Sequence, residues 1–429
     1  MEVQSEETSL YNISGKQQEG LIYYLGLLLW PFGVTVSALK NLDKPWSRNV
    51  FWLFCIFFGF TFIVAEDIGD SADSVRYAQL LGEYARSHMN LTELWRSFYA
   101  ESSGFTDIAQ PLLTYLVSRV TQNTSILFAI FGFIFGYFYS RNLSFVYTQV
   151  KGKVTPIILL YMLTFALLNP IWNINSFRMW TASHIFLYGA LPFLLEGNKK
   201  RLLWSGISVF FHFSFFFALG ILLIYSALKN RYTIFFALFL LTSFIKELDL
   251  TYVQSILSFL PDIFQIKVTS YTNQDYAELV NTNIQAFNWY LPYSSKSLEW
   301  VIYALVIFSY VFCRRYVADM QGLISLYSFS LLMYSASNIF SLVPSGDRFM
   351  VVSNTFMFAF FIIFFVTFSK NRGLNLLKVL SIPFLVLFCL VSVRIGMDYY
   401  GLVTIFGNPL FAILNTDAAP LITGIKGLL

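Results

Sequence analysis

The chain has 429 residues, of which 57% are hydrophobic and only 12% are charged. Soluble domains usually carry a charge on about a quarter of their residues, and the mean hydropathy here is +0.62. The composition therefore predicts a membrane protein. The net charge is only +4, without a long basic run, so nucleic acid is not an expected partner.

Apolar stretches of about 20 residues can cross the roughly 30 Å hydrocarbon layer of a bilayer as helices. We find eleven such stretches, at residues 21–39, 49–65, 124–140, 154–171, 177–195, 202–228, 232–245, 298–313, 321–343, 349–368 and 377–397. The sequence therefore predicts an all-α, polytopic helical membrane protein with about 11–13 membrane segments. Repeats and linkers are absent, so we expect one integral membrane domain over residues 1–429.

More than half of the Lys and Arg residues lie in short connections, which predicts that these connections face the cytoplasm. They are residues 40–48, 141–153, 199–201, 229–231, 314–315 and 370–378. The N-terminus and residues 66–107 and 247–299 are acid-rich, so we expect these and the C-terminal tail to face outward. The outward segments 66–122 and 248–297 are long enough to cover an active-site cavity. The first contains amphipathic stretches at 75–86 and 107–120.

The apolar run 202–228 joins two connections that both read as cytoplasmic. One simple crossing cannot satisfy that pattern. Either the run is a hairpin of two short helices that turns near His212, or a further membrane crossing at 255–266 restores the number of crossings that the charge pattern requires. We favour the hairpin. Irregular backbone at membrane depth needs protein or a water-filled cavity around it, so a turn at His212 would itself indicate a cavity.

Several polar side chains that are distant in sequence fall at the outer face in this topology. A guanidinium group in hydrocarbon costs about 2.5 to 17 kcal/mol, so Arg178 requires an explanation. Arginines near the outer interface present a rigid fork of donors that suits a pyrophosphate. The competing explanation for Arg178 and Arg348 is that each side chain snorkels to the interface or forms a structural ion pair. Asp347, directly before Arg348, is a candidate partner for such a pair. The outward polar set is Asp70, Asp73, Tyr77, Arg178, His212, Arg348 and Arg394.

His212 lies among phenylalanines, with Ser214 close by. One explanation is structural, a neutral histidine that is hydrogen-bonded in the core. The other is functional, a general base or a hydrogen-bond donor to the substrate. His184 is a weaker candidate, and His88 reads as a loop residue.

No phosphate-binding loop, nucleophile elbow or HExxH motif occurs, so neither a cofactor nor a metal site is predicted. An outward pair of carboxylates would still be compatible with a divalent metal.

Five short motifs carry a family resemblance. They are GDSADSVRY at 69–77, SFRMWTA at 176–182, NKKR at 198–201, FHFS at 211–214 and GDRF at 346–349. In their order and spacing the chain resembles the EpsG family of bacterial polysaccharide-synthesis membrane proteins, which is similar in role to the Wzy oligosaccharide repeat-unit polymerases.

The resemblance implies a helical fold like the C-type glycosyltransferases, including Wzy and O-antigen ligases, in the bacterial cytoplasmic (inner) membrane with the active site facing the periplasm. It implies a hexosyltransferase-type polymerase of undecaprenyl pyrophosphate-linked oligosaccharides for O-antigen, capsule or exopolysaccharide. Arg178, Arg348 and, more weakly, Arg394 would bind pyrophosphate. His212 or Asp73 would be the catalytic base, Tyr77 a positioning group, and Asp70 part of the substrate site. The lipid bilayer, a flippase and a chain-length regulator are the partners it implies.

Three other functions compete with polymerisation. An O-antigen-type ligase needs the same cations and base and differs only in its acceptor. A flippase or exporter of lipid-linked sugars should carry basic groups through the depth of the membrane or on repeated halves, and no internal repeat is detected. An O-acyltransferase could also use an intramembrane histidine, but the cytoplasmic connections are too short to build a site for an activated acyl donor.

Overall fold

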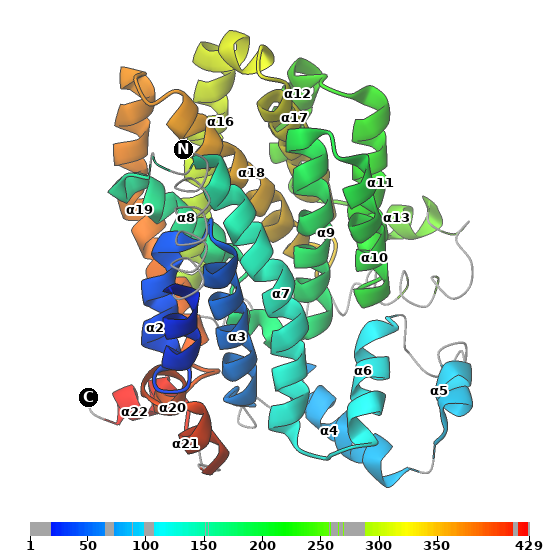
Figure 1. Ribbon diagram of the computed structural model, residues 1–429. Coiled ribbons are helices and arrows are strands. Elements are labelled where there is room, and N and C mark those ends of the chain that lie inside the picture. The colour runs from blue at the N-terminus through cyan, green and yellow to red at the C-terminus, as the bar shows by residue number, and fades with distance from the viewer. Residues whose placement is uncertain are drawn as a thin grey trace, which may run out of the picture.

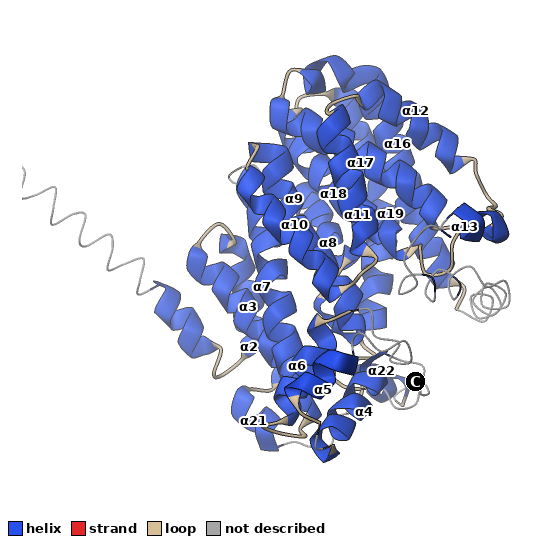
Figure 2. Ribbon diagram, turned by 90° about the vertical axis from the view of Figure 1, so that its right-hand side faces the viewer, coloured by secondary structure: helices blue, strands red, loops and turns tan. Residues whose placement is uncertain are grey.

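The computed structural model describes residues 19–64, 73–87, 89–97, 107–150, 152, 154–256, 258, 265, 269, 288–414 and 419–427. Within them every regular element is helical, and Figure 2 shows the helices packed as one bundle. Asp70, His88 and most of the outward segment 248–297 lie outside the described residues.

The prediction of a polytopic membrane protein is supported by the length and composition of six helical spans. These are Thr124–Val150, Pro156–Glu196, Tyr290–Phe312, Gln321–Phe340, Arg348–Thr367 and Arg372–Gly396. The second combines α8 (Pro156–Leu168) and α9 (Phe177–Glu196), which are separated by a short 3-10 turn at Ile171–Ser176. Shorter apolar helices complete the bundle: α3 (Pro45–Phe60), α10 (Leu202–Phe211), α11 (Phe215–Leu228) and α12 (Tyr232–Ser243).

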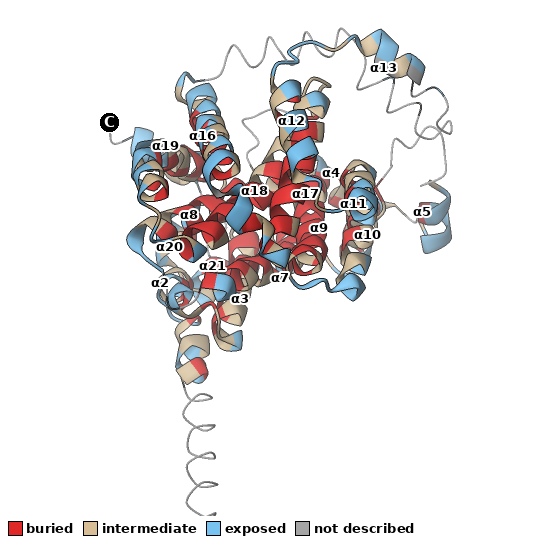
Figure 3. Ribbon diagram, turned by 90° about the horizontal axis from the view of Figure 1, so that it is seen from above, coloured by how far each residue is buried: buried red, intermediate tan, exposed pale blue. Residues whose placement is uncertain are grey.

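The centre of the bundle is built from α7 (Thr124–Val150), α9, α17 (Gln321–Phe340) and α18 (Arg348–Thr367), which are mostly buried when seen along the bundle axis (Figure 3). Glycines allow close helix approach, as is common between membrane helices. A Cβ atom at Gly59 would overlap the Phe128 carbonyl, and one at Gly132 would overlap the Cys55 carbonyl, so α3 and α7 can only pack this closely with glycine there. At the periphery, α16 (Tyr290–Ala318) and α19 (Arg372–Gly396) expose apolar side chains suited to lipid.

The basic connections gather at one end of the bundle, the upper end in Figure 1, which we call the basic end. The Tyr147 hydroxyl joins two of these connections by donating to the Lys40 carbonyl, and Asn230 in a third donates to Ser325 near the start of the helix at Gln321–Phe340. Gly322, at the start of α17, packs against the Leu195 backbone. The predicted grouping of the basic connections on one side is therefore seen in the structure.

The opposite end of the bundle carries α4 (Asp73–Arg86), α5 (Leu91–Ser97) and α6 (Ala109–Ser118), together with the C-terminal helices α20 (Leu402–Phe406), α21 (Pro409–Leu414) and α22 (Leu421–Lys426) (Figures 1 and 2). We call it the site end. The amphipathic stretches predicted at 75–86 and 107–120 correspond to α4 and α6. A short helix, α13 (Leu250–Ile256), lies to one side.

The run 202–228 is the predicted hairpin. Helix α10 descends beside α9, with the Ser205 hydroxyl donating to the Phe186 carbonyl. His212 has an extended backbone that ends α10, and α11 then returns beside α17, from Phe217 against Phe340 to Tyr225 against Phe329. The turn at His212 therefore faces the site end.

The first apolar stretch differs from the prediction. Residues 21–39 do not form one helix, because Pro31 begins a separate helix, α2 (Pro31–Ala38), and the chain folds back there so that Gly26 packs against Val34. Glu19 lies 2.9 Å from Lys44 Nζ at the basic end. Glu19 therefore lies at the basic end, and residues 1–18 of the N-terminus that we expect to face outward lie outside the described residues.

Candidate functional site

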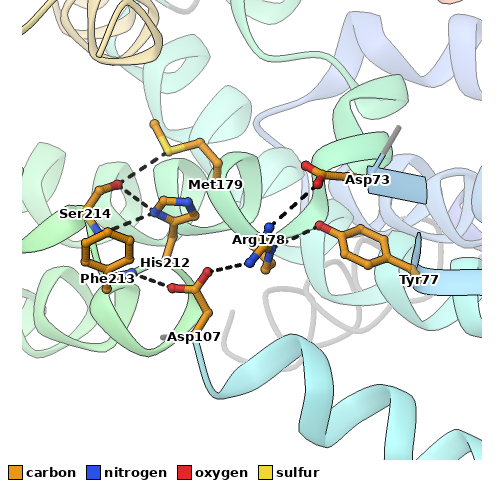
Figure 4. Close-up of polar contacts among 8 residues, drawn as sticks. All are labelled: Asp73, Tyr77, Asp107, Arg178, Met179, His212, Phe213 and Ser214. Carbon is orange, nitrogen blue, oxygen red and sulfur yellow. Dashed lines mark hydrogen bonds and ion pairs between the residues drawn. The ribbon is translucent and has the colours of Figure 1, made fainter. Parts of the chain in front are cut away.

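Arg178 is the centre of a polar cluster at the site end (Figure 4). It lies in the first turn of α9, directly after the 3-10 turn. Its Nη1 donates to Asp107 Oδ2 at 3.1 Å, its Nη2 lies 3.6 Å from Asp73 Oδ1, and its Nε donates to the Tyr77 hydroxyl at 3.3 Å. One guanidinium therefore joins α4, α9 and the start of α6.

Asp107 is the residue of this cluster that the sequence did not single out. Only 2% of its surface is exposed. While Oδ2 accepts from Arg178, Oδ1 accepts the Phe213 backbone N–H at 2.8 Å. Both carboxylate oxygens are thus occupied by donors. Asp107 is a positioning residue that ties the arginine to the turn between α10 and α11.

Asp73, the first residue of α4, has a different environment. It is partly exposed and touches Arg178 only through Oδ1, at the longer distance of 3.6 Å. Its second oxygen has no partner among the described residues. A carboxylate that is held near an arginine but keeps one oxygen free can accept a proton from a bound hydroxyl.

Tyr77 is buried on α4, with its ring edge against Phe131. Burial raises the pKa of the Tyr77 hydroxyl above its ordinary value, an effect that Arg178 opposes and Asp73 reinforces. The hydroxyl is therefore neutral. Because its oxygen accepts from Arg178 Nε, its own proton is available to donate to a ligand.

His212 lies in the turn that Asp107 fixes. Its Nδ1 accepts the Ser214 backbone N–H at 3.3 Å and lies 2.6 Å from the Ser214 hydroxyl, which also contacts the Met179 sulfur (Figure 4). Burial lowers the pKa of His212 to about 4, with Asp107 opposing the shift and Arg178 and Arg348 reinforcing it. The ring is therefore neutral at pH 7.

The contacts of His212 also identify its tautomer. A backbone N–H can only donate, so Nδ1 must carry the lone pair and Nε2 must carry the ring proton. In this arrangement His212 presents an N–H donor. Of the two roles considered from sequence, the geometry favours donation to a substrate oxygen over proton abstraction.

Arg348 begins α18 and lies close enough to His212 to lower its pKa electrostatically. It makes no ion pair with the residues that the structure describes, and Asp347 beside it does not bond to it. Arg178 is balanced by two carboxylates, whereas Arg348 has no carboxylate partner within the described part of the chain. The better-placed group for an incoming anion is therefore Arg348.

Arg394 does not join the cluster. It lies in the last turn of α19, where Nη1 contacts both carboxylate oxygens of Asp398 at 3.1 Å. That spacing of four residues is a common intrahelical ion pair. Arg394 is thus paired with a residue just past the end of its helix, and we exclude it from the cluster.

His184 is a satisfied core histidine, because its Nε2 lies 3.0 Å from the Asn169 carbonyl and Asn142 Nδ2 approaches its Nδ1. Within the described residues, no group of three metal-ligating side chains is assembled.

No protein-family model matches the chain, and no curated protein or solved structure matches it. The assignment of a function therefore depends on the site itself.

Beyond the paired Arg178 and Asp107, and counting only the described residues, the cluster offers a ligand one unpaired cation, one carboxylate with an unpaired oxygen and two neutral donors. The formal charges of Asp73, Asp107, Arg178 and Arg348 cancel. Such a site can bind an anion at Arg348 and position a hydroxyl at Asp73, which are the requirements for transferring a group from a phosphorylated donor to an alcohol.

Proposed function

We propose that the protein is a membrane glycosyltransferase that polymerises lipid pyrophosphate-linked oligosaccharide units at the outer face of the bacterial cytoplasmic membrane. The observation that carries the proposal is the meeting of Asp73, Tyr77, Arg178, His212 and Arg348 at the end of the bundle opposite the basic connections. Because basic connections face the cytoplasm, that end would face outward.

The four outward motifs behind the resemblance to EpsG-like and Wzy-like polymerases supply these five residues. The motifs are far apart in the chain, since Asp73 and Arg348 are separated by 275 positions. Their convergence supports the assignment of a C-type glycosyltransferase architecture to this chain.

The proposed reaction transfers the growing glycan from its lipid pyrophosphate to a hydroxyl of the next lipid-linked unit. Asp73 accepts the hydroxyl proton, and the oxygen attacks the anomeric carbon of the growing chain. The bond between that carbon and the phosphate oxygen breaks, and the lipid pyrophosphate leaves with the electron pair. Arg348 and the Nε2–H of His212 stabilise the charge that develops on the leaving group.

The remaining residues position this machinery. Tyr77 donates its hydroxyl proton to the sugar, and Arg178 holds Asp73 and Tyr77 in place while Asp107 holds Arg178. The partly exposed side chain of Arg178 is a second contact for pyrophosphate.

The test is chain elongation by purified wild-type protein in lipid, supplied only with lipid pyrophosphate-linked repeat units. We expect a ladder of longer glycans, with the rate reduced about 100-fold in Arg348→Gln because a hydrogen bond from a charged group is worth about 1.5–3 kcal/mol. Arg394→Gln is the matched control and should elongate normally, because Arg394 is paired with Asp398. Equal elongation by Arg348→Gln and wild type would remove Arg348 from the site.

A ligase remains the second candidate, because the same groups would transfer a finished glycan to another acceptor. It would be favoured if the wild type formed no ladder but released lipid pyrophosphate when a different acceptor was supplied.

A further inference from the structure

A cavity of about 320 Å³ opens at the basic end, away from the polar cluster, between the start of α8, the end of α18 and the first turns of α19. Its apolar lining includes Ile158, Phe365 and Val366, and its polar lining includes Thr155, Ser369 and Lys378. No acidic residue lines it. The cavity therefore combines an apolar wall with a positive charge.

Lys378 supplies that charge. Only 9% of its surface is exposed, and its Nζ lies 5.4 Å from the centre of the Phe365 ring. It forms no ion pair with any described residue. A buried ammonium without a carboxylate is costly, and an aromatic face compensates for only part of that cost. The ammonium therefore lacks an anionic partner among the residues that the structure describes.

The start of α8 adds a second positive feature to the same cavity. The Thr155 hydroxyl caps the helix by accepting the Ile158 N–H, and Pro156 occupies the first turn. Thr155 and Ile158 both line the cavity, so the positive end of the α8 dipole is directed toward it. Lysine and helix terminus come from elements more than 200 residues apart in sequence, and both favour an anion in the same space.

We propose that this cavity binds the phosphate group of an anionic amphiphile, with the phosphate between Lys378 and the start of α8 and the apolar part along Ile158, Phe365 and Val366. The phosphate can come from a membrane lipid headgroup or from a soluble phosphorylated compound, and the two sources share this recognition. The site is separate from the polar cluster and does not depend on the proposed function.

The experiment measures the thermal stability of the purified full-length protein in a neutral detergent. Three probes are titrated: short-chain phosphatidylglycerol, short-chain phosphatidylcholine and inorganic phosphate. The variants are Lys378→Met, which removes the charge but keeps the length of the side chain, and Val154→Trp, which fills the cavity from its rim. Lys370→Met is the matched control, because Lys370 is exposed and does not line the cavity.

We expect phosphatidylglycerol to stabilise the wild type, with an apparent affinity at least about tenfold weaker in Lys378→Met and Val154→Trp and unchanged in Lys370→Met. Without a probe, Lys378→Met should be at least as stable as wild type, because it removes an unpaired buried charge. An equal response to inorganic phosphate would identify the source as soluble. The proposal is overturned if Lys378→Met and wild type respond alike, or if neither phosphatidylglycerol nor phosphate stabilises the folded wild type.

Discussion

Replacing Asp107 separates the two contacts that its carboxylate makes. Asp107→Asn removes the charge that faces Arg178 but keeps an oxygen that can accept the Phe213 N–H. Asp107→Ala removes both contacts. The comparison therefore distinguishes the ion pair from the hydrogen bond that fixes the turn between α10 and α11.

The magnitudes follow from the geometry. A hydrogen bond to a charged group contributes about 1.5–3 kcal/mol, and the lower half of that range applies here because Arg178 is partly exposed and keeps Asp73. Alanine adds the cost of a buried N–H without an acceptor, about 1–3 kcal/mol. The turn should therefore open at least about fivefold more often in Asp107→Ala than in Asp107→Asn.

Hydrogen exchange of peptides that contain Phe213, measured on the protein in detergent, reports this opening directly. We expect exchange to increase in the order wild type, Asp107→Asn, Asp107→Ala. Asp398→Asn is the control, because it breaks the half-buried pair with Arg394 and should leave these peptides unchanged. Equal exchange in Asp107→Asn and Asp107→Ala would refute the role assigned to the Phe213 contact.

Three further predictions concern other residues. The folded-state pKa of His212 is about 4 against an ordinary 6.5, so the stability that its neutral ring contributes is complete above pH 6.5 and is lost as the pH falls toward 4. The melting temperatures of wild type and His212→Gln should therefore converge as the pH falls through that interval. A difference that stays constant with pH would contradict this prediction. His184→Ala should lower the free energy of unfolding by about 1–3 kcal/mol, because it removes the partner of the Asn169 carbonyl, but the folded variant should elongate glycans normally in the ladder assay. A cysteine placed at Glu19 should be labelled by an impermeant reagent from the same side of the membrane as one at Lys200. Labelling from opposite sides would contradict the fold-back of the chain at Pro31.

Charge distribution predicted much of the fold. The grouping of the basic connections and the hairpin at His212 followed from counting charges around the run 202–228, because an apolar run between two cytoplasmic connections must return. Hydropathy predicted one membrane helix over residues 21–39, because an average over the window does not register Pro31. In the structure Pro31 begins a new helix and the chain folds back there. The proline was visible in the sequence, but its consequence depends on packing against α3.

The site was only partly visible in the sequence. Asp73, Tyr77, Arg178 and His212 could be selected because each is a polar residue beside an apolar stretch or within a recognisable motif. Asp107 could not, since its partners Arg178 and Phe213 are 71 and 106 positions away and no local pattern pairs them. Arg394 could have been rejected from the sequence, because Asp398 follows it at the spacing of an intrahelical ion pair.

The most direct test of the proposed polymerase activity is the stoichiometry of its reaction. Purified protein in liposomes would receive repeat units labelled separately in the glycan and in the lipid. We expect one lipid pyrophosphate to be released for each repeat unit added to a growing glycan. Movement of intact lipid-linked units across the membrane without glycan lengthening, or no release from a folded wild type given its genuine substrate, would contradict it.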